Sequence, residues 1–335
     1  DCVCRGGQRD GCNKIKLYGI KPIYTHSFIS NMKNVVVIGG GNGSAICLEA
    51  LKKYAGSLNI SAVVSMSDSG GSSGKLRKEL KTLPPGDVLR AILSLSIYDY
   101  QSLKKIFYQP RFKNVGRLNS HNLGNLFLTL TGQFSGNFIY ALDALSQSVE
   151  AQGRVYPVTL ENTDLVAELD NGKIIRTEEF IDTPRYNRGW KIKRVWLEPN
   201  CRAYSQAVQA ITKADTIVIG SGSLYTSLVA TLLPVGIKEA IKKSKAKIIY
   251  LAGSAYRLNG ETGPENLSGM VLQLESYLPR PIDLVIHNNH KLNTKQKKIY
   301  EENSWGVFSF DKENLKNRKV VSVGFERNEG GLDPK

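Results

Sequence analysis

Two hydrophobic runs near the start of the chain, each followed by a glycine-rich segment, predict how the fold begins. Residues 35–38 are a continuous β-branched run, and residues 61–66 form a second apolar run. Such runs are typical of strands buried on both faces of a parallel sheet. Glycine-rich segments follow at residues 39–43 and 67–74. Carboxyl ends of parallel strands share one sheet edge, where glycine loops bind anions, so we predict a phosphate-bearing ligand between these two loops.

The second half of the chain repeats this arrangement. Helical spacing over residues 203–214 precedes an apolar run at 216–219, and a polar, glycine-rich segment follows at 220–227. Apolar runs at 247–251 and 284–287 have the length of further strands. We therefore expect another loop at the same sheet edge.

The middle of the chain has a different pattern. Strand-like runs at residues 165–169 and 173–177 flank an Asn-Gly turn, which predicts an antiparallel hairpin. The predicted fold class is therefore α/β. We expect a three-layer α/β/α, Rossmann-like, mostly parallel sheet with a small antiparallel, β-rich excursion at about residues 154–198.

Three common glycine motifs do not fit these loops. A dinucleotide-binding fingerprint would need a third glycine where Ser44 stands. A Walker phosphate loop would need glycine at Ser69 and a hydroxyl residue at Leu76, and a nucleophile elbow would need glycine at Ile219. An ordinary NAD enzyme and a P-loop NTPase are thus disfavoured, and a tight turn without ligand is the alternative for any single loop.

Polar side chains beside the loops are candidate ligand contacts. Asp68 lies inside the second loop, where it can face a ligand or a metal ion. Asp87 follows a Pro-Pro-Gly turn, and this position predicts that it caps the N-terminus of the next helix. Its carboxylate could instead, or in addition, lie near Asp68 at the ligand edge. His121, Asn122 and Asn125 open a helical run and could bind phosphate or a ribose hydroxyl, although a histidine at a helix start is more often a cap.

Charge and composition narrow the partners. The 335 residues carry a net charge of +15, of which residues 1–32 contribute +3, and this favours anionic partners. The lysine clusters lack interleaved aromatic residues, so nucleic acid is disfavoured. No apolar run approaches the roughly 18 residues that span a bilayer, so we expect no transmembrane helix.

Residues 1–31 differ from the rest of the chain. They contain Cys2, Cys4 and Cys12 at a spacing that fits no standard zinc site, and they lack sustained periodicity. We predict a non-native or disordered N-terminal extension at 1–31 and a single domain at 33–335. The remaining cysteines, Cys47 and Cys201, indicate a reduced, cytosolic protein, with Cys47 as a small core residue.

Taken together and in this order, the segments resemble the CofD/YvcK superfamily over residues 33–310. This superfamily contains phospholactate transferases and bacterial gluconeogenesis factors that bind nucleotide sugars. The matching segments are GGGNG at 39–43, DSGGSSG at 68–74, LR at 76–77, PPGD at 84–87, HNLGN at 121–125, LEP at 197–199, GSGSLYTS at 220–227 and GET at 260–262. The DSGGSSG and GSGSLYTS pieces look like the gluconeogenesis-factor branch.

The resemblance implies a cytoplasmic gluconeogenesis factor that regulates cell shape and envelope-precursor supply during growth on gluconeogenic carbon. It would bind a nucleotide-diphosphate small molecule, a UDP-sugar being favoured, without a required cofactor. A protein partner in envelope-precursor synthesis and a homo-oligomer are further expectations. The candidate ligand-binding residues are Gly40, Gly41, Asn42, Gly43, Asp68, Gly70, Gly71, Ser72, Ser73, Asp87, His121, Asn122, Asn125, Gly220, Ser221, Gly222, Ser223, Tyr225 and Thr226.

The superfamily also implies an alternative, a transferase. It would move a phospholactyl-type group from a nucleotide-diphosphate donor to an alcohol with Mg²⁺, and Asp68 would be catalytic, holding the metal or taking the acceptor's proton. Ser69 stands where the family often has a second acidic residue, which weakens this hypothesis because Mg²⁺ is commonly held by one or two carboxylates plus phosphate. Residues 253–270 also depart from the family pattern, in the part expected to recognise the sugar.

Overall fold

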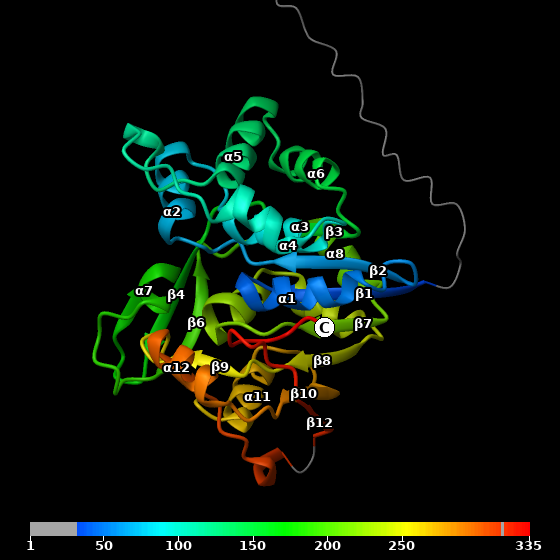
Figure 1. Ribbon diagram of the computed structural model, residues 1–335, viewed down its shortest axis with the longest axis vertical. Helices are drawn as coiled ribbons and strands as arrows, with labels where there is room; N and C mark the ends of the chain where they lie inside the picture. The colour runs from blue at the N-terminus through cyan, green and yellow to red at the C-terminus, as the bar shows by residue number, and fades with distance from the viewer. Residues whose placement is uncertain (1–31, 316–317) are drawn as a thin grey trace, which may run out of the picture. The chain divides into compact units, whose positions relative to one another are not determined.

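Seven parallel strands form the central sheet of the computed structural model, which describes residues 32–315 and 318–335 (Figure 1). Their order across the sheet is β12-β10-β8-β7-β1-β2-β3, and every neighbouring pair is parallel. The strands are β1 Lys33–Gly39, β2 Leu58–Val64, β3 Arg154–Pro157, β7 Thr216–Ile219, β8 Lys247–Leu251, β10 Leu284–Asn288 and β12 Val320–Val323.

The two predicted hydrophobic runs lie at the centre of this sheet. Residues 35–38 of β1 and 60–64 of β2 are all buried. Because successive side chains of a strand point to opposite faces, consecutive buried residues mean that both faces are covered. The predicted Rossmann-like α/β fold is confirmed.

Helices connect the strands and cover the sheet (Figure 1). The α-helices are α1 Gly41–Lys52, α2 Gly71–Leu80, α3 Gly86–Leu95, α4 Tyr100–Leu103, α5 Leu123–Ser135, α6 Phe138–Ser148, α7 Glu178–Asp182, α8 Ser205–Thr212, α9 Ala230–Leu232, α10 Ile237–Lys243, α11 Leu267–Glu275 and α12 Thr294–Glu302. Two π-helical segments, η1 Lys104–Tyr108 and η3 Leu224–Val229, and two 3₁₀ segments, η2 Gly116–Leu118 and η4 Lys312–Leu315, complete the list for the described residues.

The predicted antiparallel excursion is a separate three-stranded sheet. Its order is β5-β4-β6, formed by β4 Asp164–Leu169, β5 Ile174–Arg176 and β6 Ile192–Glu198. The hairpin β4–β5 turns at Gly172, whose φ of +82° favours glycine. The stretch from residue 154 was expected to belong to this excursion, but β3 pairs in parallel with β2 at the edge of the main sheet. The antiparallel part therefore begins at Asp164.

A further two-stranded sheet pairs β9 Ala255–Arg257 with β11 Trp305–Val307.

Cys47 is a free, buried thiol in the core, as predicted, and burial raises its pKa to about 12. Among the described residues, no helix combines the length and apolar character needed to cross a bilayer. The extension predicted at 1–31 lies outside the described residues.

Candidate functional site

The glycine loops after β1 and β7 meet where the strand order reverses. From β1 the chain continues to β2 on one side, whereas β7 lies on the other side. Ligands bind at such a switch point in open α/β sheets. A Cβ at Gly43 would lie 2.1 Å from the backbone oxygen of Ser221, so α1 can approach the loop after β7 this closely only with glycine at this position.

A cavity of about 520 Å³, here called the central cleft, opens beside these loops. Helix α1 begins there at Gly41 and α2 at Gly71, and neither helix has a side-chain cap. The first N–H groups of a helix lack intrahelical partners, so both helix ends can bind an anion. The predicted residues that line the central cleft are Gly41, Asn42, Gly43, Asp68, Gly70, Gly71, Asp87, Gly222, Ser223 and Thr226.

Two aspartates of the central cleft lie against glycines of neighbouring segments. A Cβ at Gly40 would lie 2.4 Å from Asp87 Oδ2, and a Cβ at Gly86 would lie 2.9 Å from Asp68 Oδ2. Asp87 thus fills the space beside Gly40, which precedes α1, and Asp68 together with Ser73 fills the space beside Gly86, the first residue of α3. This packing places both carboxylates at the same cleft wall.

Asp87 does not have the N-cap role that the sequence predicted. Helix α3 begins at Gly86, its cap is Pro85 without a side-chain bond, and Asp87 lies in the first turn. The Asp87 carboxylate instead forms an ion pair with Arg90, whose guanidinium also donates to the Tyr108 hydroxyl and lies 4.6 Å from that ring's centroid. Burial raises the pKa of Asp87, and the charge of Arg90 opposes this rise.

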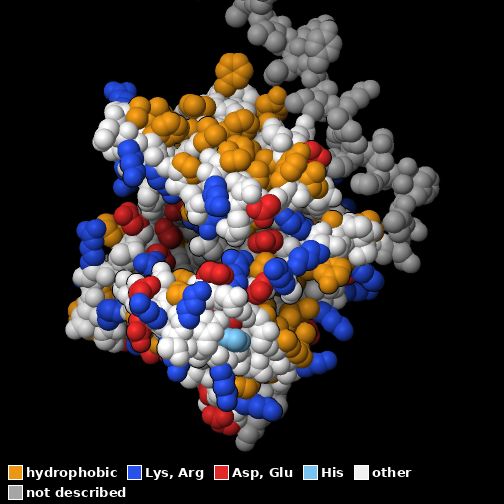
Figure 2. All heavy atoms as spheres, viewed as in Figure 1, with side chains coloured by type: hydrophobic (Ala, Val, Ile, Leu, Met, Phe, Trp, Pro, Cys, Tyr) orange, Lys and Arg blue, Asp and Glu red, His pale blue; other side chains and the backbone are white. Residues whose placement is uncertain are grey.

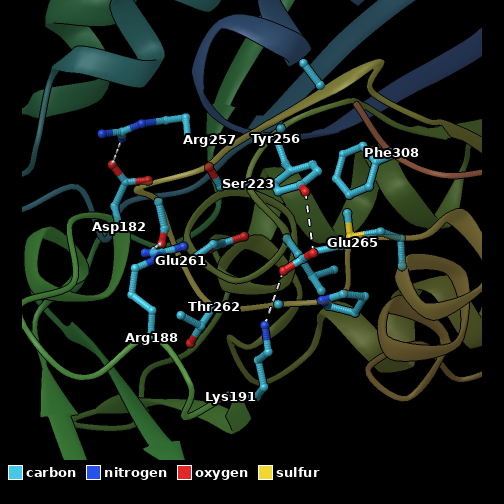
Figure 3. A pocket seen from close by; sticks show the side chains of 17 residues that line it. Asp182, Arg188, Lys191, Ser223, Tyr256, Arg257, Glu261, Thr262, Glu265 and Phe308 are labelled. Carbon is cyan, nitrogen blue, oxygen red and sulfur yellow. Dashed lines mark hydrogen bonds and ion pairs between the residues drawn. The ribbon is translucent and has the colours of Figure 1, made fainter. Parts of the chain in front are cut away.

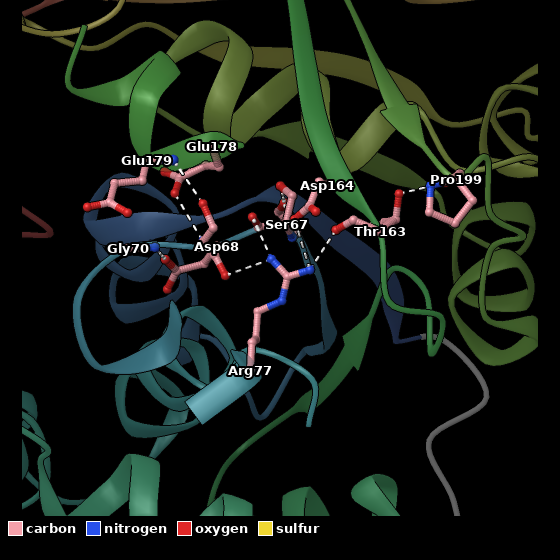
Figure 4. Close-up of polar contacts among 11 residues, drawn as sticks. Ser67, Asp68, Gly70, Arg77, Thr163, Asp164, Glu178, Glu179 and Pro199 are labelled. Atoms are coloured by element: carbon pink, nitrogen blue, oxygen red, sulfur yellow. Dashed lines mark hydrogen bonds and ion pairs between the residues drawn. The ribbon is translucent and has the colours of Figure 1, made fainter. Parts of the chain in front are cut away.

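Arg77 fixes the loop that carries Asp68 (Figure 4). It donates to the backbone oxygens of Asp68 at 3.3 Å and Thr163 at 2.8 Å, and it pairs with Asp164 at 3.2 Å. The Asp68 carboxylate itself accepts a bond of 3.1 Å from the Gly70 N–H. Arg77 therefore joins the second glycine loop to the start of β4, which positions Asp68.

Ser69 joins the same loop to helix α7. Its N–H donates to Glu178 Oε2 at 3.2 Å, and its hydroxyl accepts a bond of 2.9 Å from the Glu179 N–H. The residue that replaces the family's second acid thus brings two glutamates to the central cleft from the excursion. Burial, together with the nearby Asp68 charge, raises the pKa of Glu178.

At the loop after β7, a glutamate from a later segment of the chain occupies the helix end. Glu261 accepts bonds of 3.1 Å from the N–H groups of Tyr225 and Thr226, at the start of η3. Burial raises the pKa of Glu261 to about 7, although these N–H bonds favour its charged form. Glu261 therefore engages the Tyr225 and Thr226 N–H groups, whereas Gly41 and Gly71, the first residues of α1 and α2, line the central cleft. The Gly41 N–H donates to the Asp87 carboxylate.

The predicted His121 cluster is buried behind the central cleft. His121 Nδ1 lies 2.9 Å from Ser72 Oγ, and Asn125 Nδ2 donates to the same oxygen at 3.0 Å. Asn122 caps α5 by accepting from the Asn125 N–H at 2.7 Å. Burial lowers the pKa of His121. These side chains hold the first turn of α2, and direct ligand contact by them stays a prediction.

The other candidates also lie outside the lining of the central cleft. The Tyr225 hydroxyl donates to the backbone oxygen of Ile192 at 3.1 Å, inside the core. A Cβ at Gly220 would lie 2.9 Å from Ser44 Oγ, so Gly220 permits close packing on α1. The candidates behind the cleft wall are Gly40, Ser72, Ser73, His121, Asn122, Asn125, Gly220, Ser221 and Tyr225.

Two side cavities adjoin the central cleft, and Gly222 and Arg257 line all three spaces. The aromatic side cavity, of about 340 Å³, has walls that include Tyr100, Tyr256 and Trp305. Ser221 lines it as well.

The charged side cavity has about 170 Å³ and is drawn in Figure 3. Its wall includes Lys191 and Glu265, which pair at 3.3 Å, and Arg188, which donates to the Gly260 oxygen at 2.6 Å. Arg257 pairs with Asp182 at 2.6 Å where this cavity meets the central cleft.

Sequence reasoning missed several residues of the central cleft. They are Arg90, Glu178, Glu179, Asp182, Thr183, Ser227 and Arg257. Arg90 could have been found, because it lies three residues after Asp87 on a predicted helix. No local signal marks residues 178–183, since tertiary contacts bring α7 to the cleft.

Carboxylates outnumber arginines in the central cleft. Its wall holds Asp68, Asp87, Glu178, Glu179 and Asp182 against Arg90 and Arg257. Within the described residues, no group of three or more His, Cys, Asp or Glu side chains is arranged to hold a metal ion. A metal ion at Asp68 would therefore need oxygen ligands from a phosphate.

The fold and the cleft define a Rossmann-like α/β protein with a polar cleft at its topological switch point. Residues 35–325 match the family model described as 2-phospho-L-lactate transferase CofD. The chain therefore belongs to the CofD family, and the resemblance that the sequence motifs indicated is confirmed.

Relatives and a solved structure support this assignment over most of the chain. A Thermotoga maritima protein is 39% identical over 284 residues, which cover 84% of this chain and 87% of the relative. A Halalkalibacterium halodurans protein named gluconeogenesis factor is 37% identical over 295 residues, covering 87% and 88%. A crystal structure of a Bacillus halodurans member of the UPF0052 family aligns with a TM-score of 0.82 at 34% identity, covering 90% of this chain and 96% of that one.

Proposed function

We propose that this chain is a cytoplasmic gluconeogenesis factor that binds a nucleotide sugar, with a UDP-sugar as its ligand, and regulates envelope-precursor supply and cell shape. The observation that carries the proposal is the convergence of two uncapped helix ends, those of α1 and α2, on one central cleft. Two adjacent N-terminal helix ends suit a diphosphate, which presents negative charge to both. The relatives named gluconeogenesis factor support the regulatory role.

The two side cavities suit the two ends of such a ligand. In this proposal the base stacks on Tyr256 or Trp305 in the aromatic side cavity. The sugar hydroxyls bond to Lys191 and Glu265 in the charged side cavity, whose wall includes residues of the 253–270 stretch that departs from the family pattern. Arg257 lines all three spaces and would contact the phosphates by exchanging Asp182 for a phosphate oxygen.

The carboxylates of the cleft favour a second candidate, the transferase. Asp68, Glu179 and Asp182 would favour a cation beside a bound nucleotide diphosphate, because a cation offsets the repulsion between these carboxylates and the phosphates. Asp68 would hold Mg²⁺ together with the diphosphate, and the metal would neutralise charge on the leaving phosphate. Arg77 and Gly70 would keep the Asp68 carboxylate oriented.

A thermal-shift titration of residues 32–335 tests both candidates. The ligands are UDP-N-acetylglucosamine, other UDP- and GDP-linked compounds and GTP, each with and without Mg²⁺. A ligand at about 100 times its Kd adds about 2.7 kcal/mol of stability, which is about 5 °C in Tm for a domain of this size.

The outcomes separate the two candidates. We expect a UDP-sugar to raise Tm without Mg²⁺. A rise in Tm only with a guanine nucleotide and Mg²⁺ would favour the transferase over the regulator. Asp68→Asn should then abolish the metal-dependent activity. No rise with any of these compounds would contradict both.

A further inference from the structure

Helix α5 exposes a stripe of large apolar side chains that no other part of the described chain covers. Leu123, Leu130 and Phe134 are 46%, 55% and 89% exposed. Their spacing of seven and four residues places them on one face of the helix. Single exposed leucines are common on protein surfaces, but an aligned stripe that ends in a nearly fully exposed phenylalanine is a candidate contact surface.

The segment before α5 extends this apolar stripe. Phe112, Val115 and Leu118 are exposed within residues 111–119, all of which are exposed. This segment folds back on the start of α5, since the Phe112 N–H donates to the His121 oxygen at 3.0 Å and the Ser120 N–H donates to the Phe112 oxygen at 2.8 Å. We call the exposed apolar residues of 111–134 and the basic residues among them the α5 face.

Figure 2 shows hydrophobic side chains gathered over the part of the molecule that α5 and α6 form in Figure 1, with basic side chains at its margin. Within this part, residues 100–142 carry charge of one sign, whereas α6 also includes the exposed Asp143. Residues 100–142 contain no Asp or Glu, whereas Lys105, Arg111, Lys113 and Arg117 are basic and exposed. Apolar side chains thus alternate with basic ones along residues 111–118.

This distribution of charge selects the occupant of the α5 face. A second copy that docked through the same residues would bring two basic 111–119 segments together, and like charges at an interface oppose association. An anionic lipid surface offers both features that the α5 face needs, negative headgroups for the basic side chains and an apolar layer for Leu130 and Phe134. We propose that the α5 face docks on an anionic membrane surface, independently of the ligand in the central cleft.

Co-sedimentation with lipid vesicles tests this proposal on the chain as it exists. The vesicles are phosphatidylcholine alone and phosphatidylcholine mixed with phosphatidylglycerol. Four basic residues near an anionic surface should raise binding to the mixed vesicles at least about tenfold. Added salt should reduce this difference, because it screens exposed charges.

Matched variants tie the binding to the α5 face. Leu130→Ser combined with Phe134→Ser should abolish vesicle binding, and Lys113→Gln combined with Arg117→Gln should remove the preference for anionic lipid. Leu272→Ser is the control, because Leu272 is an apolar side chain on α11 that is 60% exposed outside the α5 face. All these positions are exposed, so the variants should keep the Tm of the unchanged chain.

Three results would overturn the proposal. The first is no binding to either kind of vesicle, and the second is binding that the α5-face variants leave unchanged. The third is a dimer, seen by light scattering, that dissociates when Leu130→Ser and Phe134→Ser are combined. The last result would assign the face to a second copy.

Discussion

Single residues at the ends of α1 and α2 determine whether the central cleft attracts or repels an anion. Asn42 is exposed in the first turn of α1, a turn without any acidic residue. Its side chain lines the central cleft, so a charge placed there acts directly on a bound diphosphate. The same charge would interact favourably with the helix end itself, which lets binding and folding be separated.

Asn42→Asp should weaken nucleotide-sugar binding without lowering stability. The added carboxylate repels the diphosphate, which we expect to cost about tenfold in affinity, and it favours the N-terminal end of α1 by about 0.3–1 kcal/mol. Thermal-shift titration measures both quantities. Asn137→Asp, at the N-cap of α6, is the control and should bind normally. An unchanged affinity of Asn42→Asp would place the diphosphate elsewhere.

Glu261 should give the protein a pH-dependent stability. Its pKa is about 7 in the folded chain, against roughly 4.3 in an unfolded one. The folded state therefore binds the proton more tightly, and stability falls by up to about 1.4 kcal/mol per pH unit as pH rises from about 4.3 through 7. Below about pH 4.3 this contribution is fully present.

Glu261→Gln should remove this dependence. As pH rises from about 5 to about 8, the unchanged chain loses stability and the variant does not, so the variant becomes more stable relative to the unchanged chain. The Tm of both proteins at both pH values measures this difference. Glu265→Gln, in the neighbouring charged side cavity, controls for loss of a carboxylate. The same Tm difference at both pH values would contradict the role assigned to Glu261.

At the scale of elements, the contact between α1 and the loop after β7 is a tight packing constraint at the site. Gly43→Ala should destabilise the fold by about 2–3 kcal/mol or more, because the new methyl group would meet the Ser221 backbone oxygen at 2.1 Å. Alanine in a helix is otherwise favourable by about 0.5–1 kcal/mol, so the sign of the effect identifies the clash.

Gly56→Ala provides the matched control for this contact. Its Cβ would meet nothing within 4 Å, and the free energy of unfolding should stay within about 1 kcal/mol of that of the unchanged chain. Chemical denaturation measures both variants. Equal stabilities of Gly43→Ala and Gly56→Ala would show that α1 and the loop after β7 can separate.

The same scale explains what the sequence could and could not predict. Buried β-branched runs and glycine loops are local signals, so the main strands and the loops at 39–43 and 67–74 were predictable. Helix α7 has five residues, too few to form by intrinsic propensity, and Ser69 holds it from far away in the sequence. The Asp87 cap was predicted wrongly because Arg90, one helical turn later, engages its carboxylate.

For the whole molecule, the site joins both halves of the parallel sheet. Loops after β1 and β2 come from one half, and the loop after β7 comes from the other. A ligand in the central cleft would therefore contact segments more than 150 residues apart in the chain, such as Gly43 and Gly222. Binding should stabilise the sheet as one unit.

Hydrogen exchange should show this coupling in a specific pattern. We expect a bound UDP-sugar to slow exchange at residues 41–43 and at Gly71, which line the central cleft at helix ends without side-chain caps. Tyr225 and Thr226 should change little, because Glu261 already accepts from their N–H groups. Slowed exchange at 225–226 with no change at 41–43 would reverse the assignment of the phosphate loops.

The packing of Asp87 on Gly40 and of Asp68 on Gly86 has a consequence for how this family can evolve. Each glycine leaves room for one particular carboxylate, so the fitness effect of a substitution at one position depends on the residue at the other. Alanine at Gly40 should be tolerated only beside a residue smaller than aspartate at 87. Divergence at the cleft would thus proceed through paired changes, and the acidic wall would be inherited or lost together with the glycine loops.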